Sequence, residues 1–174
     1  SAGWQRVRLF DRGSGATVSW ALELAGSQPR LAFYEGAQLG GAGEVLYYAW
    51  CQTNCLSAAG WQRQPLGLAR LNGKHPDLAL DVQGRPRLAY VLFDAGGLGY
   101  SGCSGNCESG AAAWQHKVVE TRANLLSAWP VAYPPHCDGG LWDGLSPSLA
   151  LGGAGKPRIA YDAPYHARCI YIPE

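Results

Sequence analysis

Short apolar runs recur along the chain, and turns rich in glycine separate them. The clearest example is the run at 77–80, where Leu78 and Leu80 alternate with less apolar neighbours. A turn containing Gly84 follows, and then a second apolar run that begins with a proline. Alternation with a period of two is typical of half-buried β-strands, and we find no convincing 3.6-residue period of an amphipathic helix. The pattern therefore predicts an all-β chain.

The pattern is written three times. Each copy opens with a Trp-Gln pair and later contains a Pro-Arg pair that leads an apolar strand. We expect four short antiparallel strands in every copy, with the strand after the tryptophan coming first, and a third copy lengthened by an inserted segment. The chain is thus predicted to be one repeat domain, 1–174, with units at about 4–60, 61–113 and 114–174. The tryptophans that open the copies, which are expected to pack in the core or between units, are Trp4, Trp61 and Trp114.

Four strands in a unit of this length match one blade of a β-propeller. The segment from Leu78 to Tyr90, Leu-Ala-Leu-Asp-x-x-Gly-x-Pro-Arg-Leu-Ala-Tyr, resembles a repeat of secreted bacterial propeller-type proteins whose units also carry Cys-x3-Cys and Trp. The resemblance implies propeller-type blades and is weak for function, since that family is mostly uncharacterised. Propellers usually have four to eight blades, so three units imply a partial propeller or one completed by a partner. The alternative three-unit fold is the β-trefoil.

The six cysteines follow the repeat. Two Cys-x3-Cys pairs close the first two units, one cysteine holds the same place in the third, and the last lies in the inserted segment. The most economical of the 15 connectivities, which we expect, is Cys51–Cys55, Cys103–Cys107 and Cys137–Cys169. Disulfides indicate an oxidising compartment, so the chain is expected to be secreted, at the cell surface or periplasmic. The alternatives are reduced thiols or a metal site, because His136 and His166 could join Cys137 and Cys169 in a tetrahedral set.

Composition narrows the class of protein. Hydrophobic residues make up 47% and charged residues 16% of the chain, a mix that excludes a disordered chain and is low in charge for a cytosolic surface. The net charge of +1, without a basic cluster, argues against nucleic-acid binding, and no apolar run is long enough for a membrane span. The chain contains no methionine, which indicates a processed or excised chain.

Charged residues that recur in the repeat are expected to be structural. Arg30, Arg87 and Arg158 occupy one position of the three units, so they point to equivalent places and need not converge as the arginines of sialidases do. The turn at 81–84 resembles part of an Asp-box hairpin, in which the aspartate serves the turn. The acidic residues just past the Pro-Arg strand, which we expect to cap turns or pair with those arginines, are Glu35, Asp94 and Asp162. His75 and His116 are expected at the surface.

A site is better sought where the repeat is broken. The inserted segment, 124–143, contains aromatic rings, carboxylates and a stiff Pro-Pro pair, a combination that suits sugar or protein recognition. The same segment could instead cover an open sheet edge. The candidate ligand-binding residues are Trp129, Tyr133, His136, Asp138, Trp142 and Asp143.

Catalytic patterns are weaker. The sequence has no Gly-x-Ser-x-Gly, His-Glu-x-x-His or phosphate loop, and only Asp138 and Asp143 could perform acid–base work on a glycosidic bond. We therefore expect an extracellular or periplasmic binding or scaffolding module that catalyses nothing and uses no cofactor or metal. Its expected partners are a protein, a second copy through open sheet edges, or a carbohydrate. The alternatives are a structural subunit that completes a larger assembly and a fragment of a glycosidase or sialidase-like hydrolase.

Overall fold

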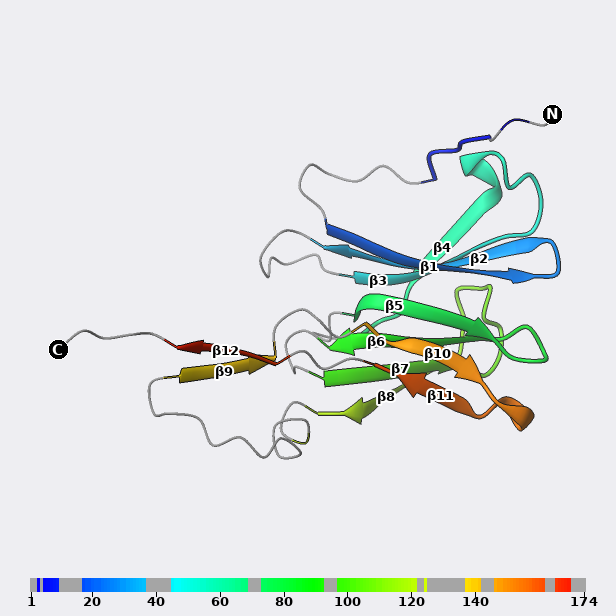
Figure 1. The fold of residues 1–174 in the computed structure, drawn as a ribbon. Coiled ribbons are helices and arrows are strands. Elements are labelled where there is room, and N and C mark those ends of the chain that lie inside the picture. The colour runs from blue at the N-terminus through cyan, green and yellow to red at the C-terminus, as the bar shows by residue number, and fades with distance from the viewer. Residues whose placement is uncertain are drawn as a thin grey trace.

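A computed structural model shows an antiparallel all-β protein, as the sequence predicts (Figure 1). The structure describes residues 3, 5–9, 17–36, 45–68, 73–92, 97–121, 124, 137–141, 146–161 and 165–169. Two four-stranded sheets and a two-stranded sheet form three layers, and a second two-stranded sheet lies beyond their end (Figure 1).

The first sheet is a meander of four hairpin-connected strands in the order β1-β2-β3-β4. A tight turn joins the first two strands, and Gly26 supplies the left-handed φ of 64° that this turn requires. A single 3₁₀ turn, Ala58–Gly60, precedes the last strand. The strands are β1 (Thr17–Ala25), β2 (Gln28–Gly36), β3 (Val45–Cys51) and β4 (Trp61–Pro65).

The second sheet repeats this order as β5-β6-β7-β8. Gly84, with a φ of 73°, occupies the turn between its first two strands. A bulge between Lys74 and Asp77 bends the first strand, and His75 takes a positive φ there. The strands are β5 (Gly73–Leu80), β6 (Pro86–Leu92), β7 (Gly97–Cys103) and β8 (Trp114–Glu120).

The third unit departs from the prediction, because its strands do not form one four-stranded sheet. β10 (Ser148–Leu151) pairs with β11 (Pro157–Ala160) around a 3₁₀ turn, Gly153–Gly155. β12 (Tyr165–Cys169) pairs instead with β9 (Cys137–Leu141), a strand of the inserted segment. The insertion thus supplies an additional strand, which satisfies the backbone hydrogen bonds of β12 in place of β11.

The predicted order of strands within a unit is also wrong. The strands that begin with Trp61 and Trp114 pair with the strand before them, so each one completes a sheet as its fourth strand. The cause lies in the cysteine pairs. Each disulfide closes the short loop after the third strand, so the chain turns back and places its tryptophan directly opposite the first cysteine, Cys51 or Cys103.

The core lies between the two four-stranded sheets. Tyr34, Tyr48 and Trp50 of the first sheet pack against Leu88 and Tyr90 of the second, and all five are at most 4% exposed. A fully buried aliphatic or aromatic side chain contributes about 1.5–3 kcal/mol to folding, so this interface is the main source of stability. The layers approach each other mostly through their first strands, since β1 and β2 lie against β5, and β10 lies against β5 and β6.

The tryptophan prediction is confirmed for Trp114. Trp114 meets Tyr48 of the first sheet edge-on, with ring centroids 5.5 Å apart, and so packs between layers. Trp61 occupies the same place in the first sheet, where its indole N–H donates to the Cys55 carbonyl at 3.1 Å. Trp4 lies outside the described residues.

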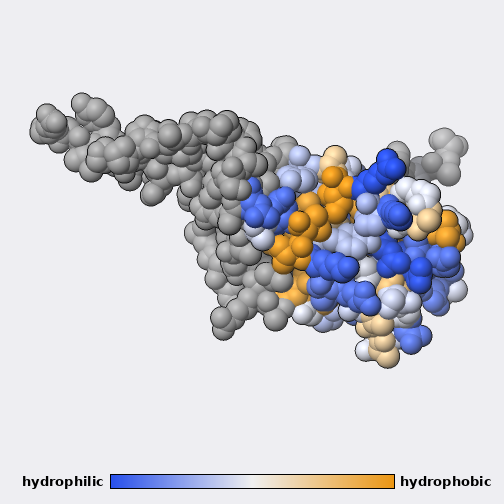
Figure 2. Space-filling view, turned by 90° about the horizontal axis from the view of Figure 1, so that it is seen from below, coloured by the Kyte–Doolittle hydropathy of each residue, from blue (hydrophilic) through white to orange (hydrophobic). Residues whose placement is uncertain are grey.

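The fourth strand of the second sheet, β8, lies at the edge of that sheet. Its Val118 and Val119 are 50% and 48% exposed. Figure 2, which shows the molecule from below, reveals an apolar band among hydrophilic residues on this side.

Candidate functional site

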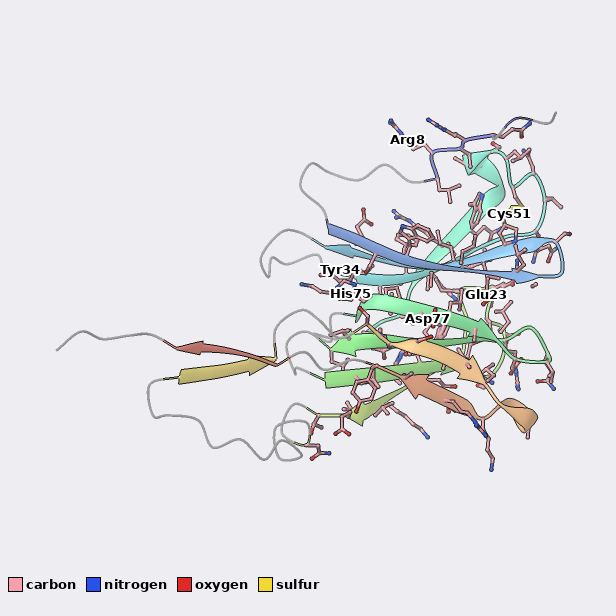
Figure 3. The ribbon with its side chains drawn as sticks, viewed as in Figure 1. Arg8, Glu23, Tyr34, Cys51, His75 and Asp77 are labelled. Carbon is pink, nitrogen blue, oxygen red and sulfur yellow. A yellow bond between two sulfur atoms is a disulfide. The ribbon has the colours of Figure 1, made fainter. Side chains whose placement is uncertain are left out.

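Polar side chains concentrate at the end of the layers where the hairpin turns and the disulfide loops lie. In the first sheet, the turn after β1 and the loop after β3 meet there, and the Gln28 side chain donates to the Gln52 carbonyl at 3.2 Å. Figure 3 places Glu23 and Cys51 toward this end, whereas Tyr34 and His75 lie toward the opposite end. We call it the hairpin end.

Arg30 connects the two sheets at the hairpin end. Its guanidinium, 5% exposed, donates to the Cys51 carbonyl at 3.1 Å and forms an ion pair with Glu108 at 2.5 Å. Glu108 belongs to the disulfide loop of the second sheet and also accepts a hydrogen bond from Gln52 at 2.9 Å. Burial beside this pair raises the pKa of the Tyr48 hydroxyl, which stays protonated.

A second contact between the layers lies nearby. The Gln64 side chain, on the last strand of the first sheet, donates to the Cys107 carbonyl at 2.8 Å. The loop of the second sheet is therefore bound to the first sheet through both its backbone and its Glu108 carboxylate.

Arg87 repeats the geometry of Arg30 in the second sheet. It donates to the Cys103 carbonyl at 2.7 Å and to the Asp81 carboxylate at 2.8 Å. The two arginines thus serve equivalent disulfide loops in separate layers, which confirms the structural prediction for both. Arg158 lies at the surface of β11.

Of the three acidic residues expected to cap turns or pair with the arginines, the structure describes Glu35. Glu35 forms an ion pair with Arg63 at 3.4 Å, so its expected pairing with Arg30 is wrong. The cause is the register, which places Arg30 and Glu35 at opposite ends of the same strand. Asp94 and Asp162 lie outside the described residues.

Asp81 organises the turn between β5 and β6, as predicted. Its carboxylate accepts the backbone N–H groups of Gln83 and Arg85 at 3.0 and 2.9 Å, and the Arg85 guanidinium at 2.8 Å. Burial favours the protonated acid, but these hydrogen bonds and the Arg85 charge outweigh it, so the pKa of Asp81 lies below its usual value.

Two open cavities lie side by side at the hairpin end and share Gly84. One, of about 490 Å³, lies between the β5–β6 turn at 83–85 and the disulfide loop at 105–109. The other, of about 540 Å³, lies between the ends of β1 and β5 and reaches Leu151. The first has charged groups, Arg85 and Glu108, on opposite walls, so it could accept a polar ligand.

A chain of three hydrogen-bonding side chains lies in the second sheet. Tyr90 and Ser101 share a hydrogen bond of 2.8 Å, and Ser101 contacts Nδ1 of His116 at 2.6 Å. Burial lowers the pKa of His116, which favours its neutral form. Ser101 is completely buried, so a substrate cannot reach its hydroxyl, and the chain is structural rather than a nucleophile–base pair.

Most of the predicted ligand-binding residues lie outside the described residues: Trp129, Tyr133, His136, Trp142 and Asp143. The backbone of Asp138 lies on β9, opposite Arg168 of β12. Among the side chains that the structure describes, no group of three or more His, Cys, Asp or Glu residues could hold a metal.

The cysteine prediction is confirmed for two pairs. Cys51–Cys55 and Cys103–Cys107 are disulfide-bonded. Cys137 and Cys169 are backbone partners in the β9–β12 register, and their side chains lie outside what the structure describes.

Sequence reasoning missed Glu108 and Gln52. The available signal was a difference between the repeats, because Leu56 follows the second cysteine of the first unit where Glu108 follows that of the second. A charge that appears in only one copy marks a contact that only one copy makes.

Comparison with protein-family models, with curated proteins and with solved structures finds no significant match. Within the described residues, no helix is long and apolar enough to cross a membrane. Fold and site together define an antiparallel all-β protein of layered sheets with two disulfide-closed loops.

Proposed function

We propose that this chain is a non-catalytic binding or scaffolding module, built from propeller-type blades. The observation that supports this proposal most is that charged side chains at the hairpin end form structural hydrogen bonds and ion pairs. Arg30, Arg87, Asp81 and Glu108 are all engaged in holding loops and layers together. Such groups build a rigid frame rather than a reactive centre.

The propeller-type architecture is supported by the way the layers meet. Each four-stranded sheet is a meander, and successive layers are closest at their first strands. Sheets arranged around a shared axis approach each other most closely at their innermost strands, which is the geometry of propeller blades. β1, β5 and β10 would then be the innermost strands.

The two disulfides support a location outside the cytosol. Bonds of this kind persist in secreted, cell-surface and periplasmic proteins and are rare under reducing conditions. We therefore place the module in one of those oxidising compartments.

Recognition is assigned to the inserted segment, 124–143, whose aromatic rings and carboxylates suit a glycan or an extended protein surface. The test is a glycan array followed by tryptophan fluorescence titration of any glycan that binds. Trp142→Ala should abolish binding, whereas the control Trp20→Phe, which alters an exposed tryptophan of the first sheet, should preserve it. An array without any response, or equal loss in both variants, would refute glycan recognition.

The same samples test the absence of catalysis. Bound glycans should be recovered intact after long incubation. Cleavage that disappears in the double variant Asp138→Asn with Asp143→Asn would overturn the proposal and establish a glycosidase.

A further inference from the structure

The first sheet exposes a row of large apolar side chains on the face that points away from the second sheet. Trp20, Leu22 and Leu24 alternate along β1 and are 67%, 52% and 59% exposed. They lie on β1, and first strands are where the layers of this protein approach one another. The row therefore lies where a further layer would make its closest contact.

The repeat shows what normally covers this position. Leu24, Leu80 and Leu151 each lie opposite the proline of the Pro-Arg pair in the next strand, which aligns the three units residue by residue. Two positions earlier the equivalent residues are Leu22, Leu78 and Leu149. Leu78 is 2% exposed and Leu149 is 8% exposed, because each faces the layer before it.

Trp61 provides a second correspondence between the outer face of the first sheet and the face by which the second sheet meets the first. Trp61 is equivalent to Trp114, since each lies opposite the first cysteine of its loop. Trp114 packs on Tyr48 of the layer before it, and Trp61 holds the same place in the first sheet. The outer face of the first sheet is thus a copy of the face by which the second sheet joins its neighbour.

The third unit presents the complementary face. Arg158 and Ala160 are exposed on β11. Their equivalents in the first sheet, Arg30 and Ala32, are 4% and 0% exposed because the second sheet covers them. The chain therefore has two complementary outer faces, the β1 face of the first sheet and the β10–β11 face of the third unit. Together they could form one more interface of the kind that joins its layers.

We propose that a second copy of this chain docks here head to tail, with the β10–β11 face of one copy on the β1 face of the other. The inference deepens the proposed scaffolding function and rests on it. Such a junction is heterologous, since two different surfaces meet, and it repeats the contact already made twice within one chain. Apolar area that is exposed in a single copy becomes buried without any change of fold.

One residue distinguishes this junction from the internal one. Inside the chain, Arg30 pairs with Glu108 of the following layer, but Leu56, 68% exposed, occupies the position of Glu108 in the first unit. Arg158 of the docking copy would therefore meet an apolar side chain. Leu56→Glu would restore the missing ion pair and strengthen the junction.

The experiment measures the mass of the full chain by analytical ultracentrifugation across a concentration series. The wild type should self-associate, and Leu22→Asp and Ala160→Asp should each be monomeric with unchanged circular dichroism, since both residues are exposed in one copy. The control Val82→Asp, in the β5–β6 turn and 90% exposed, should associate like the wild type. Leu56→Glu should lower the dissociation constant about fivefold, as for one ion pair.

Mixing the two monomeric variants tests the head-to-tail geometry. The Leu22→Asp variant loses its β1 face but keeps an intact β11 face, and the Ala160→Asp variant keeps an intact β1 face. An equal mixture of the two should therefore form a heterodimer. A wild type that stays monomeric at every concentration, or a mixture that stays monomeric, would overturn the proposal. Glycan binding through 124–143 is measured separately, so failure of self-association leaves that result intact.

Discussion

Arg30 of the first sheet and Glu108 of the second form an ion pair that joins the two layers at a distance of 2.5 Å. The arginine is almost completely buried, whereas the glutamate side chain is 24% exposed. Each partner also binds the first sheet's disulfide loop, through the Cys51 carbonyl and the Gln52 side chain. The pair therefore fixes both the spacing of the layers and the position of two loops.

Replacing Glu108 with glutamine should destabilise the protein by about 2 kcal/mol. Loss of one partner leaves the buried Arg30 charge uncompensated, and the cost is smaller than for a fully buried pair because Glu108 is partly exposed. Urea unfolding measures the change in the free energy of unfolding, with Glu120→Gln, opposite Leu98 on β8, as the control. Equal stability of the two variants would contradict this role.

Acid should weaken the protein through Asp81. Because its pKa is lower in the folded chain than in the unfolded chain, its contribution is complete above about pH 4 and disappears as the pH falls through the folded value. Unfolding experiments between neutral and acidic pH should therefore show a loss of stability below about pH 4 that is smaller in Asp81→Asn. An identical pH dependence in both proteins would show that Asp81 does not contribute.

Cys137 and Cys169 should form a third disulfide. They face each other in the β9–β12 register, and directly opposed residues of antiparallel strands lie within the distance that a disulfide spans. Alkylation of the native, unreduced protein should add no mass, and alkylation after reduction should modify all six cysteines. Two alkylated cysteines in the native protein would refute the bridge.

The repeat made several features predictable. The pairings Cys51–Cys55 and Cys103–Cys107 were predictable because each Cys-x3-Cys pair closes its own unit, shortly before the tryptophan that opens the next unit. The turn role of Asp81 followed from the resemblance of the turn at 81–84 to part of an Asp-box hairpin. These features depend on neighbouring residues, and local sequence determines them.

Other features were not predictable because they depend on choices between distant segments. A periodic sequence defines the spacing of its units but not where one sheet ends, so Trp61 and Trp114 were placed in the wrong sheet. Predicting that β12 pairs with β9 would have required knowing which of two strands, β9 or β11, forms its backbone hydrogen bonds. Glu108 was missed because its partner, Arg30, lies in another layer.

The equivalent leucines Leu22 and Leu78 test most directly whether each sheet hides its apolar face against the sheet before it. Leu78→Ala should lower the free energy of unfolding by about 2–4 kcal/mol, because it removes a fully buried side chain from the interface between layers. Leu22→Ala, measured at a concentration where the chain is monomeric, should change it by less than about 0.5 kcal/mol. Equal losses in the two variants would contradict the layered account.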